Sequence, residues 1–439
     1  MRSRLTPFLI LLAVVIVGIA LLLVIRRAQE DVTGAGLSDQ PAGTPQTSPS
    51  PTSSQVVPAH ASGLEPSPRY TATPSPVGEE MNQQPGGEEP PLIEFLGMIT
   101  FPTSFTYQDT IVGGLSALTY HPDRDVYYVL SDDRGRVNAP RFYTVTIDIG
   151  DGRLDEGDVT FTGVGFLRDT GGRAYSPGDL DPEGLALSPG ETLYISSEGD
   201  TDERIDPFVQ EYGLNGRWLS ALPLPEKFLP TADGSGGVRD NLALESLTRS
   251  PAGILLYTAV ENALQQDGPE TGLDIPSPAR ILVYDLATGR PGGEYVYVVE
   301  PVPASPLPAG EISNGLVELI ALDDAGTFLA LERAYTAGVG NTIILYTIQL
   351  SGATDVSAVA ALNAGDIAVD LAGIRPVGKQ FLFDVGSVVD RVDNVEGMAL
   401  GPLLPDGRQT LILVSDNNFN LVQQTQFILL ALDPAFRPE

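Results

Sequence analysis

The sequence predicts an all-β fold, a β-propeller of five four-stranded blades. Two observations support this prediction: one hairpin motif occurs five times, and further strand-like segments lie between its copies. From Leu92 onward, short runs of Val, Ile, Leu, Tyr, Phe and Thr are separated by Gly, Asp, Asn and Pro. No amphipathic helix pattern interrupts them, which is typical of many short antiparallel strands.

Each copy of the repeat contains an acidic position, one or two small residues, an apolar strand, a turn, a second apolar strand and a second acidic position. The five copies are GLSALTYHPDRDVYYVLSDD (114–133), DPEGLALSPGETLYISSEGD (181–200), NLALESLTRSPAGILLYTAVE (241–261), NGLVELIALDDAGTFLALERA (314–334) and NVEGMALGPLLPDGRQTLILVSDN (394–417). The chain between the starts of successive copies is long enough for four strands per unit.

Segments between the hairpins supply the remaining strands. Residues 140–148 and 158–167 follow the first hairpin, and residues 279–289 and 294–300 follow the third. After the fifth hairpin only residues 426–434 remain, so the preceding segment 92–102 is expected to complete the last blade and close the ring. The longer fourth interval, with segments 367–374 and 379–388, leaves a sixth degenerate blade open as an alternative.

The acidic positions are the candidate ligands. In the first repeat Ser116 takes the place of the first acid, and in the last repeat the two positions lie farther apart, which indicates a longer turn. The first acids are Glu183, Glu245, Glu318 and Glu396, and the second are Asp132, Glu198, Glu261, Glu332 and Asp416. Glu318 and Glu332 fit the pattern less well, because VELIAL has no Gly or Ser after the Glu.

Composition limits the chemistry to carboxylates, hydroxyls and some arginines. The 439-residue chain has no cysteine, two histidines, 57 acidic and 25 basic side chains, and a formal net charge of -32. Thiolate nucleophiles, Cys-ligated zinc and His-cluster metal sites are excluded. His121 lies in the turn-like YHPDRD, no G-x-S-x-G motif is present, and GSGG (234–237) is interpreted as a loop rather than a phosphate cradle.

In a propeller the innermost strands surround one axis, so equivalent acids from successive blades should converge. Clustered carboxylates raise one another's pKa, and a hard cation with oxygen ligands, calcium above all, would stabilise them. The alternative is that each acid accepts backbone N–H bonds from the neighbouring blade, and the two roles can coexist. The candidate metal ligands are Asp132, Asp181, Glu183, Glu198, Glu245, Glu261, Glu318, Glu332, Glu396 and Asp416.

The motif set resembles the phytase-like family described as having esterase-like activity, over roughly residues 95–435. The resemblance implies a propeller that is usually secreted or attached to a surface. The positions that match are Ser116, Asp132, Asp133, Arg134, Asp181, Glu183, Glu198, Asn241, Glu245, Glu261, Asn394, Glu396 and Asp416. Propeller phytases also use several lysines and arginines for phosphates, whereas Lys227 and Lys379 are the only lysines of this chain, which argues against phytate itself as substrate.

Two functions from different classes follow. The first is a metal-assisted hydrolase of phosphate or carboxylic esters, with Glu183, Glu245 and Glu396 as catalytic candidates and Arg134, with Arg333, as a binder of anionic substrate. Salt bridges to neighbouring acids are the alternative role for both arginines. The second function is a non-catalytic propeller that binds a ligand or protein and holds structural calcium.

The N-terminal region predicts attachment to a membrane. Residues 8–25 form an unbroken apolar run that is long enough to span a bilayer core, and residues 1–27 are therefore expected to be a cytoplasmic stub and an uncleaved signal anchor. Residues 28–91, rich in Pro, Ser, Thr, Gly and Gln, are expected to be a disordered linker. Residues 92–439 would form the extracytoplasmic propeller.

The expected partners follow from the charge. A chain this acidic is not expected to bind nucleic acid, which requires basic patches. We expect a monomeric propeller that takes a small ester or anionic ligand, with contact to the membrane through its N-terminal helix only.

Overall fold

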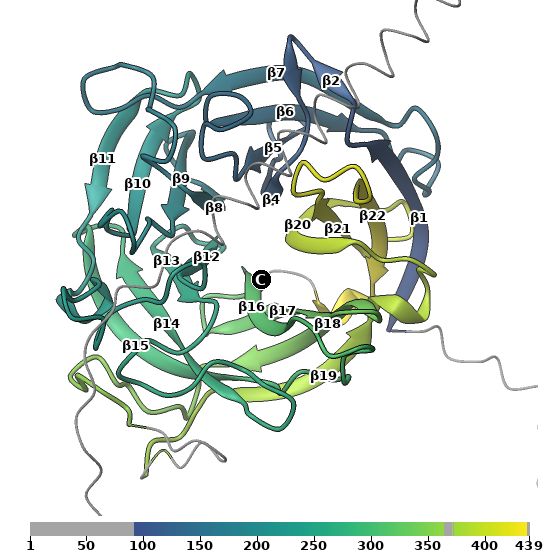
Figure 1. Cartoon of the computed structure of the whole chain (residues 1–439). Coiled ribbons are helices and arrows are strands. Elements are labelled where there is room, and N and C mark those ends of the chain that lie inside the picture. Colours follow the sequence, from purple (N-terminus) through teal and green to yellow (C-terminus); the bar gives the residue numbers. More distant parts are fainter. Residues whose placement is uncertain (1–91, 364–370, 372, 437–439) are drawn as a thin grey trace, which may run out of the picture. The chain divides into compact units, whose positions relative to one another are not determined.

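The computed structural model describes residues 92–363, 371 and 373–436, and five four-stranded antiparallel sheets surround a common centre in it (Figure 1). Within each sheet the strands follow one another in chain order from the centre outward, except where the ring closes. The innermost strands are β4 (Leu115–His121), β8 (Pro182–Leu187), β12 (Leu244–Arg249), β16 (Ile312–Ala321) and β20 (Asn394–Leu403). The five-bladed propeller is therefore confirmed.

The remaining strands of each blade lie progressively farther from the centre (Figure 1). The second strands are β5 (Val126–Ser131), β9 (Thr192–Ser197), β13 (Leu255–Val260), β17 (Thr327–Thr336) and β21 (Gln409–Asp416). The third strands are β6 (Arg141–Ile147), β10 (Phe208–Gly213), β14 (Ser277–Asp285), β18 (Gly340–Gln349) and β22 (Gln424–Leu432). The outermost strands are β7 (Val159–Phe166), β11 (Trp218–Leu222), β15 (Arg290–Val299), β19 (Gly378–Asp384) and β1 (Ile93–Pro102).

The ring closes as the sequence predicts. Strand β1 pairs antiparallel with β22, from Ile93 opposite Leu432 to Pro102 opposite Gln424, so the first strand of the domain completes the last blade. This closure leaves no blade to be finished by another chain and covers the edge of β22.

The longer fourth interval does not hold a sixth blade among the described residues. Its segment 379–388 contains β19, which is the outermost strand of the fourth blade, and the rest of the interval is a long connection from β18. Val356, Leu362 and Leu371 of this connection pack on Val296 of the third blade. Most of the segment 367–374 lies outside the described residues.

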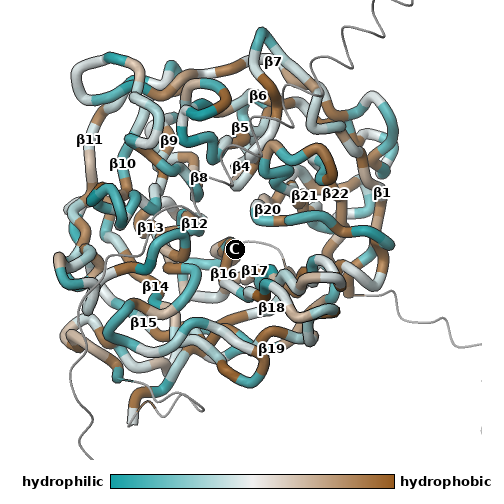
Figure 2. The backbone as a smooth tube through the Cα atoms, in the orientation of Figure 1, coloured by the Kyte–Doolittle hydropathy of each residue, from teal (hydrophilic) through white to brown (hydrophobic). Residues whose placement is uncertain are grey.

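Apolar side chains between neighbouring blades form the core. Leu247 of β12 and Leu319 of β16 belong to one buried cluster, and Leu118 of β4 and Phe427 of β22 belong to another. Apolar residues recur along the strands, and the connecting loops carry much of the hydrophilic sequence (Figure 2). A short ribbon of β2 (Thr106–Tyr107) and β3 (Thr110–Ile111) and three 3-10 turns, η1 (Glu226–Phe228), η2 (Val385–Ser387) and η3 (Pro434–Phe436), complete the fold.

The expected anchor (8–25) and linker (28–91) lie outside the described residues. Among the residues that are described, no helix is long and apolar enough to cross a membrane.

Candidate metal centre

A cavity of about 1630 Å³ lies where the innermost strands begin and the second strands end. Eight of the ten expected ligands line it, and they come from four of the five blades: Asp132, Asp181, Glu183, Glu198, Glu245, Glu261, Glu396 and Asp416. Most of these side chains are buried, and Glu183, Glu245 and Glu396 are each only 8% exposed. The convergence expected from the repeats is therefore present in the structure.

A β-bulge marks the first ring position of each blade, which is an acid in three of the five blades. In all five innermost strands the register with the second strand shifts at the same point, which leaves one or two residues unpaired. Such a bulge redirects a side chain relative to the strand. The residues at the shift are Ser116, Glu183 with Gly184, Glu245, Val317 and Glu396.

This register corrects the alignment of the fourth repeat by one residue. The unpaired position in β16 is Val317, whereas Glu318 is paired with Leu331. In the other blades, the second acid directly follows the residue that pairs just before the bulge. In the fourth blade Leu316 is paired with Glu332 just before the bulge, so the equivalent position is Arg333. At the first ring position the fourth blade therefore has Val317, where the other blades have Ser or Glu. At the second ring position it has Arg333, where the other blades have Asp or Glu.

Glu318 and Glu332 lie away from the cavity. The carboxylate of Glu318 accepts N–H bonds from Leu319 at 2.9 Å and from Leu247 and Met398 of the two neighbouring blades. Glu332 accepts a hydrogen bond from Tyr297 at 2.8 Å and forms an ion pair with Lys379. Glu318 thus has the bracing role that was the alternative to metal binding, and Glu332 belongs to an ion-pair cluster within the blades.

Asp181, Glu183 and Glu198 form the tightest group of acids. One oxygen atom from each carboxylate lies within 4.8 Å of the others, and all three residues are buried. Asp181 precedes β8, Glu183 is at its bulge and Glu198 follows β9, so a single hairpin positions all three. This donor set of hard oxygen atoms suits a divalent cation such as calcium.

Several of the carboxylates have no neutralising partner. No hydrogen bond or ion pair within the described residues reaches the side chains of Asp132, Glu183 or Glu245. Burial, followed by repulsion from the neighbouring acids, holds the pKa of each of these three groups well above its usual range. Burial also raises the pKa of Asp181 to about 6 and that of Glu261 to about 7.

Two arginines neutralise part of the cavity. Arg333 forms ion pairs with Glu396 at 3.0 Å and Glu261 at 3.6 Å. Arg134 forms an ion pair with Asp181 and donates to the side-chain oxygen of Asn241 at 2.6 Å. Both contacts of Arg134 use the same terminal nitrogen. The expected salt bridges of both arginines are therefore present, and Arg134 keeps further N–H donors at the cavity wall.

Amides and backbone groups hold the remaining acids in place. Asn394 donates to Glu396 at 2.9 Å, and the N–H of Asn418 donates to Asp416 at 2.7 Å. Glu198 accepts a hydrogen bond from the N–H of Ala243, just before β12. It therefore contacts the neighbouring blade and also belongs to the acidic group. Gly114 has a φ of +62°, and a Cβ there would lie 1.8 Å from a carboxylate oxygen of Asp132.

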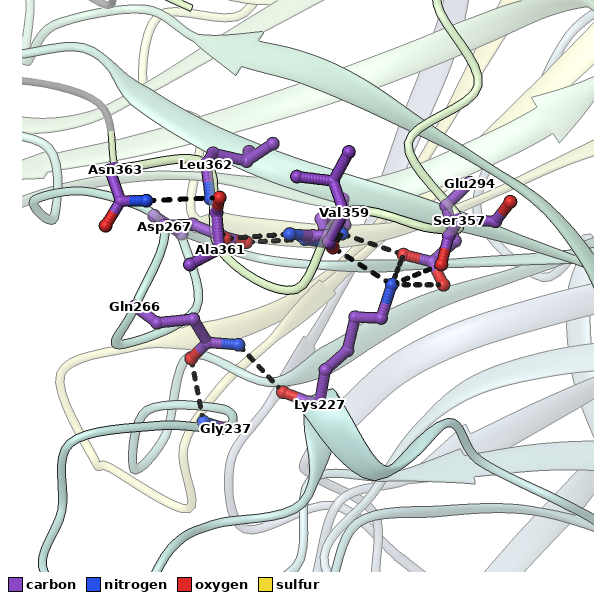
Figure 3. Close-up of polar contacts among 12 residues, drawn as sticks. Lys227, Gly237, Gln266, Asp267, Glu294, Ser357, Val359, Ala361, Leu362 and Asn363 are labelled. Atoms are coloured by element: carbon purple, nitrogen blue, oxygen red, sulfur yellow. Dashed lines mark hydrogen bonds and ion pairs between the residues drawn. The ribbon is translucent and has the colours of Figure 1, made fainter.

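Other residues singled out in the sequence have structural roles. Asp133 forms an ion pair with Arg141 at 2.8 Å and accepts three backbone N–H bonds from residues 136–138. Lys227 reaches Glu294 at 3.2 Å and the carbonyl of Ser357 at 2.6 Å (Figure 3). His121 is buried at the far end of β4 and 2% exposed, and its two ring nitrogens have no hydrogen-bond partner within the part of the chain that the structure describes. None of these three side chains lines the acidic cavity.

The repeat alignment misses Arg333 as part of the ring, although the sequence contains a signal for it. The aligned pair Glu318 and Glu332 is closer together in the chain than the equivalent pairs of the first and third repeats. Val317 and Arg333 have the same separation as Ser116 and Asp132, so requiring equal hairpin lengths selects them over the two glutamates.

The comparisons with known proteins agree with the motif set. The family model "Phytase-like: Esterase-like activity of phytase" matches residues 110–419, a range that includes the whole acidic group. The chain belongs to this family. An "Uncharacterized secreted protein" of Arthroderma benhamiae is 28% identical over 211 residues, which cover 41% of this chain and 39% of that protein. The match thus spans well under half the length of this relative.

Two solved structures that match the chain are distant from it in sequence. An endo-arabinase from Bacteroides thetaiotaomicron is 12% identical, with a TM-score of 0.38, over 77% of this chain and 97% of that chain. A PQQ-bound aldose sugar dehydrogenase from Streptomyces coelicolor is 14% identical, with a TM-score of 0.32, over 74% of this chain and 82% of that chain.

Proposed function

We propose that this member of the phytase-like family is a cation-dependent hydrolase of phosphate or carboxylic esters. The observation that carries the proposal is the buried group Asp181, Glu183 and Glu198, whose oxygen atoms lie within 4.8 Å of one another. Holding three carboxylates this close without a cation or protons is unfavourable. Bound calcium would supply a Lewis acid that polarises the ester and lowers the pKa of a bound water molecule.

The chain's own residues have separate tasks in this proposal. Asp181, Glu183 and Glu198 would hold the cation, and Asp132 and Glu245 carry additional unpaired carboxylates on the same cavity. Burial and the neighbouring acids raise the pKa of Glu245, which makes its carboxylate a stronger base than a free one and suits it to accept a proton from water. The unoccupied N–H groups of Arg134 would orient an anionic ester, because a guanidinium binds phosphate or carboxylate through paired hydrogen bonds.

Catalysis would take place outside the cytoplasm. The support is the apolar run at residues 8–25, which would anchor the chain, together with the Arthroderma relative, which is described as a secreted protein. Millimolar calcium outside cells would suit a site of modest affinity.

The alternative is a non-catalytic propeller that uses the cation as a structural element. Its support is that no histidine or lysine side chain lines the acidic cavity within the described residues, so nucleophilic catalysis has no conventional base there. Glu318 and Glu198, which brace neighbouring blades through backbone N–H groups, show that acids of this fold also serve structure.

Calcium titration of the full chain separates these functions. Thermal unfolding and hydrolysis of 4-nitrophenyl phosphate and 4-nitrophenyl acetate are followed in parallel. For a hydrolase, turnover requires calcium, and Glu183→Gln weakens calcium affinity at least about 10-fold and abolishes turnover. Glu226→Gln, an exposed glutamate of η1, is the matched control and should change neither. Stabilisation by calcium without turnover would support the structural alternative, and no response to calcium would contradict both.

A further inference from the structure

A second cavity lies at the opposite ends of the innermost strands. It has a volume of about 500 Å³ and is lined by the last residues of β4, β8, β12, β16 and β20. Most of its lining residues are apolar, although its exposed wall is polar and apolar in similar measure, and it differs from the first cavity with its many carboxylates. The apolar side chains that line it include Leu118, Leu185, Leu247, Leu319, Met398 and Leu403.

Arg249, the last residue of β12, brings a positive charge to this apolar wall. Within the described residues no carboxylate forms an ion pair with Arg249, and its hydrogen bond is a long one, 3.4 Å, to the carbonyl of Pro251. Burial lowers the pKa of Arg249, with Asp324 opposing this effect from beyond ion-pair distance. An unpaired, partly buried guanidinium is unexpected in a chain with 57 acidic and 25 basic side chains.

Other buried arginines of the propeller have partners. Arg141 is paired with Asp133 at 2.8 Å, Arg280 with Glu294 at 2.9 Å, and Arg333 with Glu396 at 3.0 Å. A buried or half-buried charge without a counter-ion is costly, because it loses hydration without gaining an equivalent contact. Arg249 therefore retains the capacity to bind an anion that the other three have already used.

Neighbouring polar side chains of the cavity already have hydrogen-bond partners within the protein. Glu318 accepts three backbone N–H bonds, and Thr248 accepts the N–H of Ala321 at 3.1 Å. Gln409 donates to the carbonyls of Gly401 at 2.6 Å and Thr410 at 3.1 Å. Tyr120 donates to Asp125 at 2.8 Å. Among the lining residues that the structure describes, Arg249 is the one cationic donor, and it lies beside leucine and methionine side chains.

We propose that this cavity binds a small amphiphile, an apolar chain that ends in a carboxylate. The carboxylate would accept hydrogen bonds from Arg249, and the chain would lie along the wall towards Leu403, which is 50% exposed at the rim. The cavity suits both parts of such a ligand. A guanidinium binds a carboxylate through paired N–H groups, and removal of apolar surface from water favours contact between the apolar chain and the wall. This site is independent of the acidic cavity and of its proposed activity.

The test uses the purified full chain and three ten-carbon probes: decanoate, decan-1-ol and decylamine. Calorimetric titration should give a dissociation constant for decanoate of about 1 mM or tighter, and at least about 10-fold weaker binding of the other two. Arg249→Gln should weaken decanoate binding about 10-fold and leave decan-1-ol binding unchanged. Arg217→Gln, an exposed arginine on the turn before β11, is the matched control and should bind decanoate like the unaltered chain.

A second variant guards against loss of folding in Arg249→Gln. Leu403→Ser alters only the rim, so it should weaken decanoate binding several-fold and leave hexanoate binding nearly unchanged. Equal binding of decanoate and decan-1-ol would overturn the proposal, since the charge would then have no role. Unchanged decanoate binding by Arg249→Gln would also overturn it, because the probe would then be bound elsewhere, for example at the apolar run 8–25.

Discussion

Arg333 shows how one residue changes the character of the carboxylate ring. It occupies the register position that Asp132, Glu198, Glu261 and Asp416 hold in the other blades. Its ion pairs with Glu261 and Glu396 neutralise one side of the cavity, and the group around Glu183 keeps its negative charge on the other. The guanidinium in the fourth blade would therefore direct an external cation towards the hairpin of β8 and β9.

Removal of Arg333 tests this division. In Arg333→Gln, Glu261 and Glu396 lose their counter-charge while remaining buried, so the free energy of unfolding in EDTA should fall by about 3 kcal/mol. Calcium should then raise the melting temperature more in the variant than in the unaltered chain, because a cation can replace the missing guanidinium. Arg217→Gln is the control, and an unchanged melting temperature in EDTA would show that the ion pairs contribute little.

Among the structural elements, the β-bulge sets the position of the first acid in β8, β12 and β20. The register shift falls between Val395 and Gly397 in β20 and at the corresponding point of the other innermost strands. The small residue after the acid is required by close packing. A Cβ on Gly397 would lie 2.9 Å from the Cα of Ala117 and 2.8 Å from a methyl group of Val414.

Gly397→Ala should therefore destabilise the propeller. The added methyl group meets the backbone of β4, which cannot move without disturbing the adjoining blade, so we expect a loss of about 1–3 kcal/mol in unfolding free energy. Gly378→Ala in β19 is the matched control, because its Cβ would have no neighbour closer than 3.7 Å. Urea unfolding of both variants measures the difference, and equal stability would show that the two blades can separate at little cost.

For the molecule as a whole, the acidic cavity couples stability to pH. Burial raises the pKa of Asp181 to about 6, of Glu261 to about 7 and of Asp416 to about 8. Unfolded carboxyl groups titrate near pH ~4, so between pH ~4 and ~8 the folded chain binds more protons than the unfolded chain. The stability contributed by these groups is therefore complete below pH ~4 and is lost as pH rises towards ~8.

This coupling predicts that stability without calcium falls as pH rises, whereas the stabilisation by calcium increases. In EDTA the melting temperature should fall between pH 5 and pH 8, and added calcium should raise it more at pH 8 than at pH 5, because protons and the cation compete for the same oxygen atoms. Thermal unfolding at the two pH values with and without calcium measures this. A melting temperature in EDTA that is constant or rises from pH 5 to pH 8 would contradict it.

Local patterns in the sequence were sufficient to predict the architecture. The five hairpins, the strands between them and the unpaired segment 92–102 predict five blades and their closure, because strand periodicity and turn residues act locally. The convergence of Glu183, Glu245 and Glu396 follows from the same repeats.

Which charges face one another depends instead on the packing of the blades. A one-residue difference in register turns a side chain to the other face of a strand, and in the fourth blade it places Val317 and Arg333, not Glu318 and Glu332, at the ring positions. Likewise, Arg249 has an apolar wall beside it and no carboxylate partner within the described residues because five strand ends from distant parts of the chain meet there. Hairpin length, a local pattern, can indicate the register of the fourth blade, whereas the surroundings of Arg249 arise from contacts between blades, which no local pattern encodes.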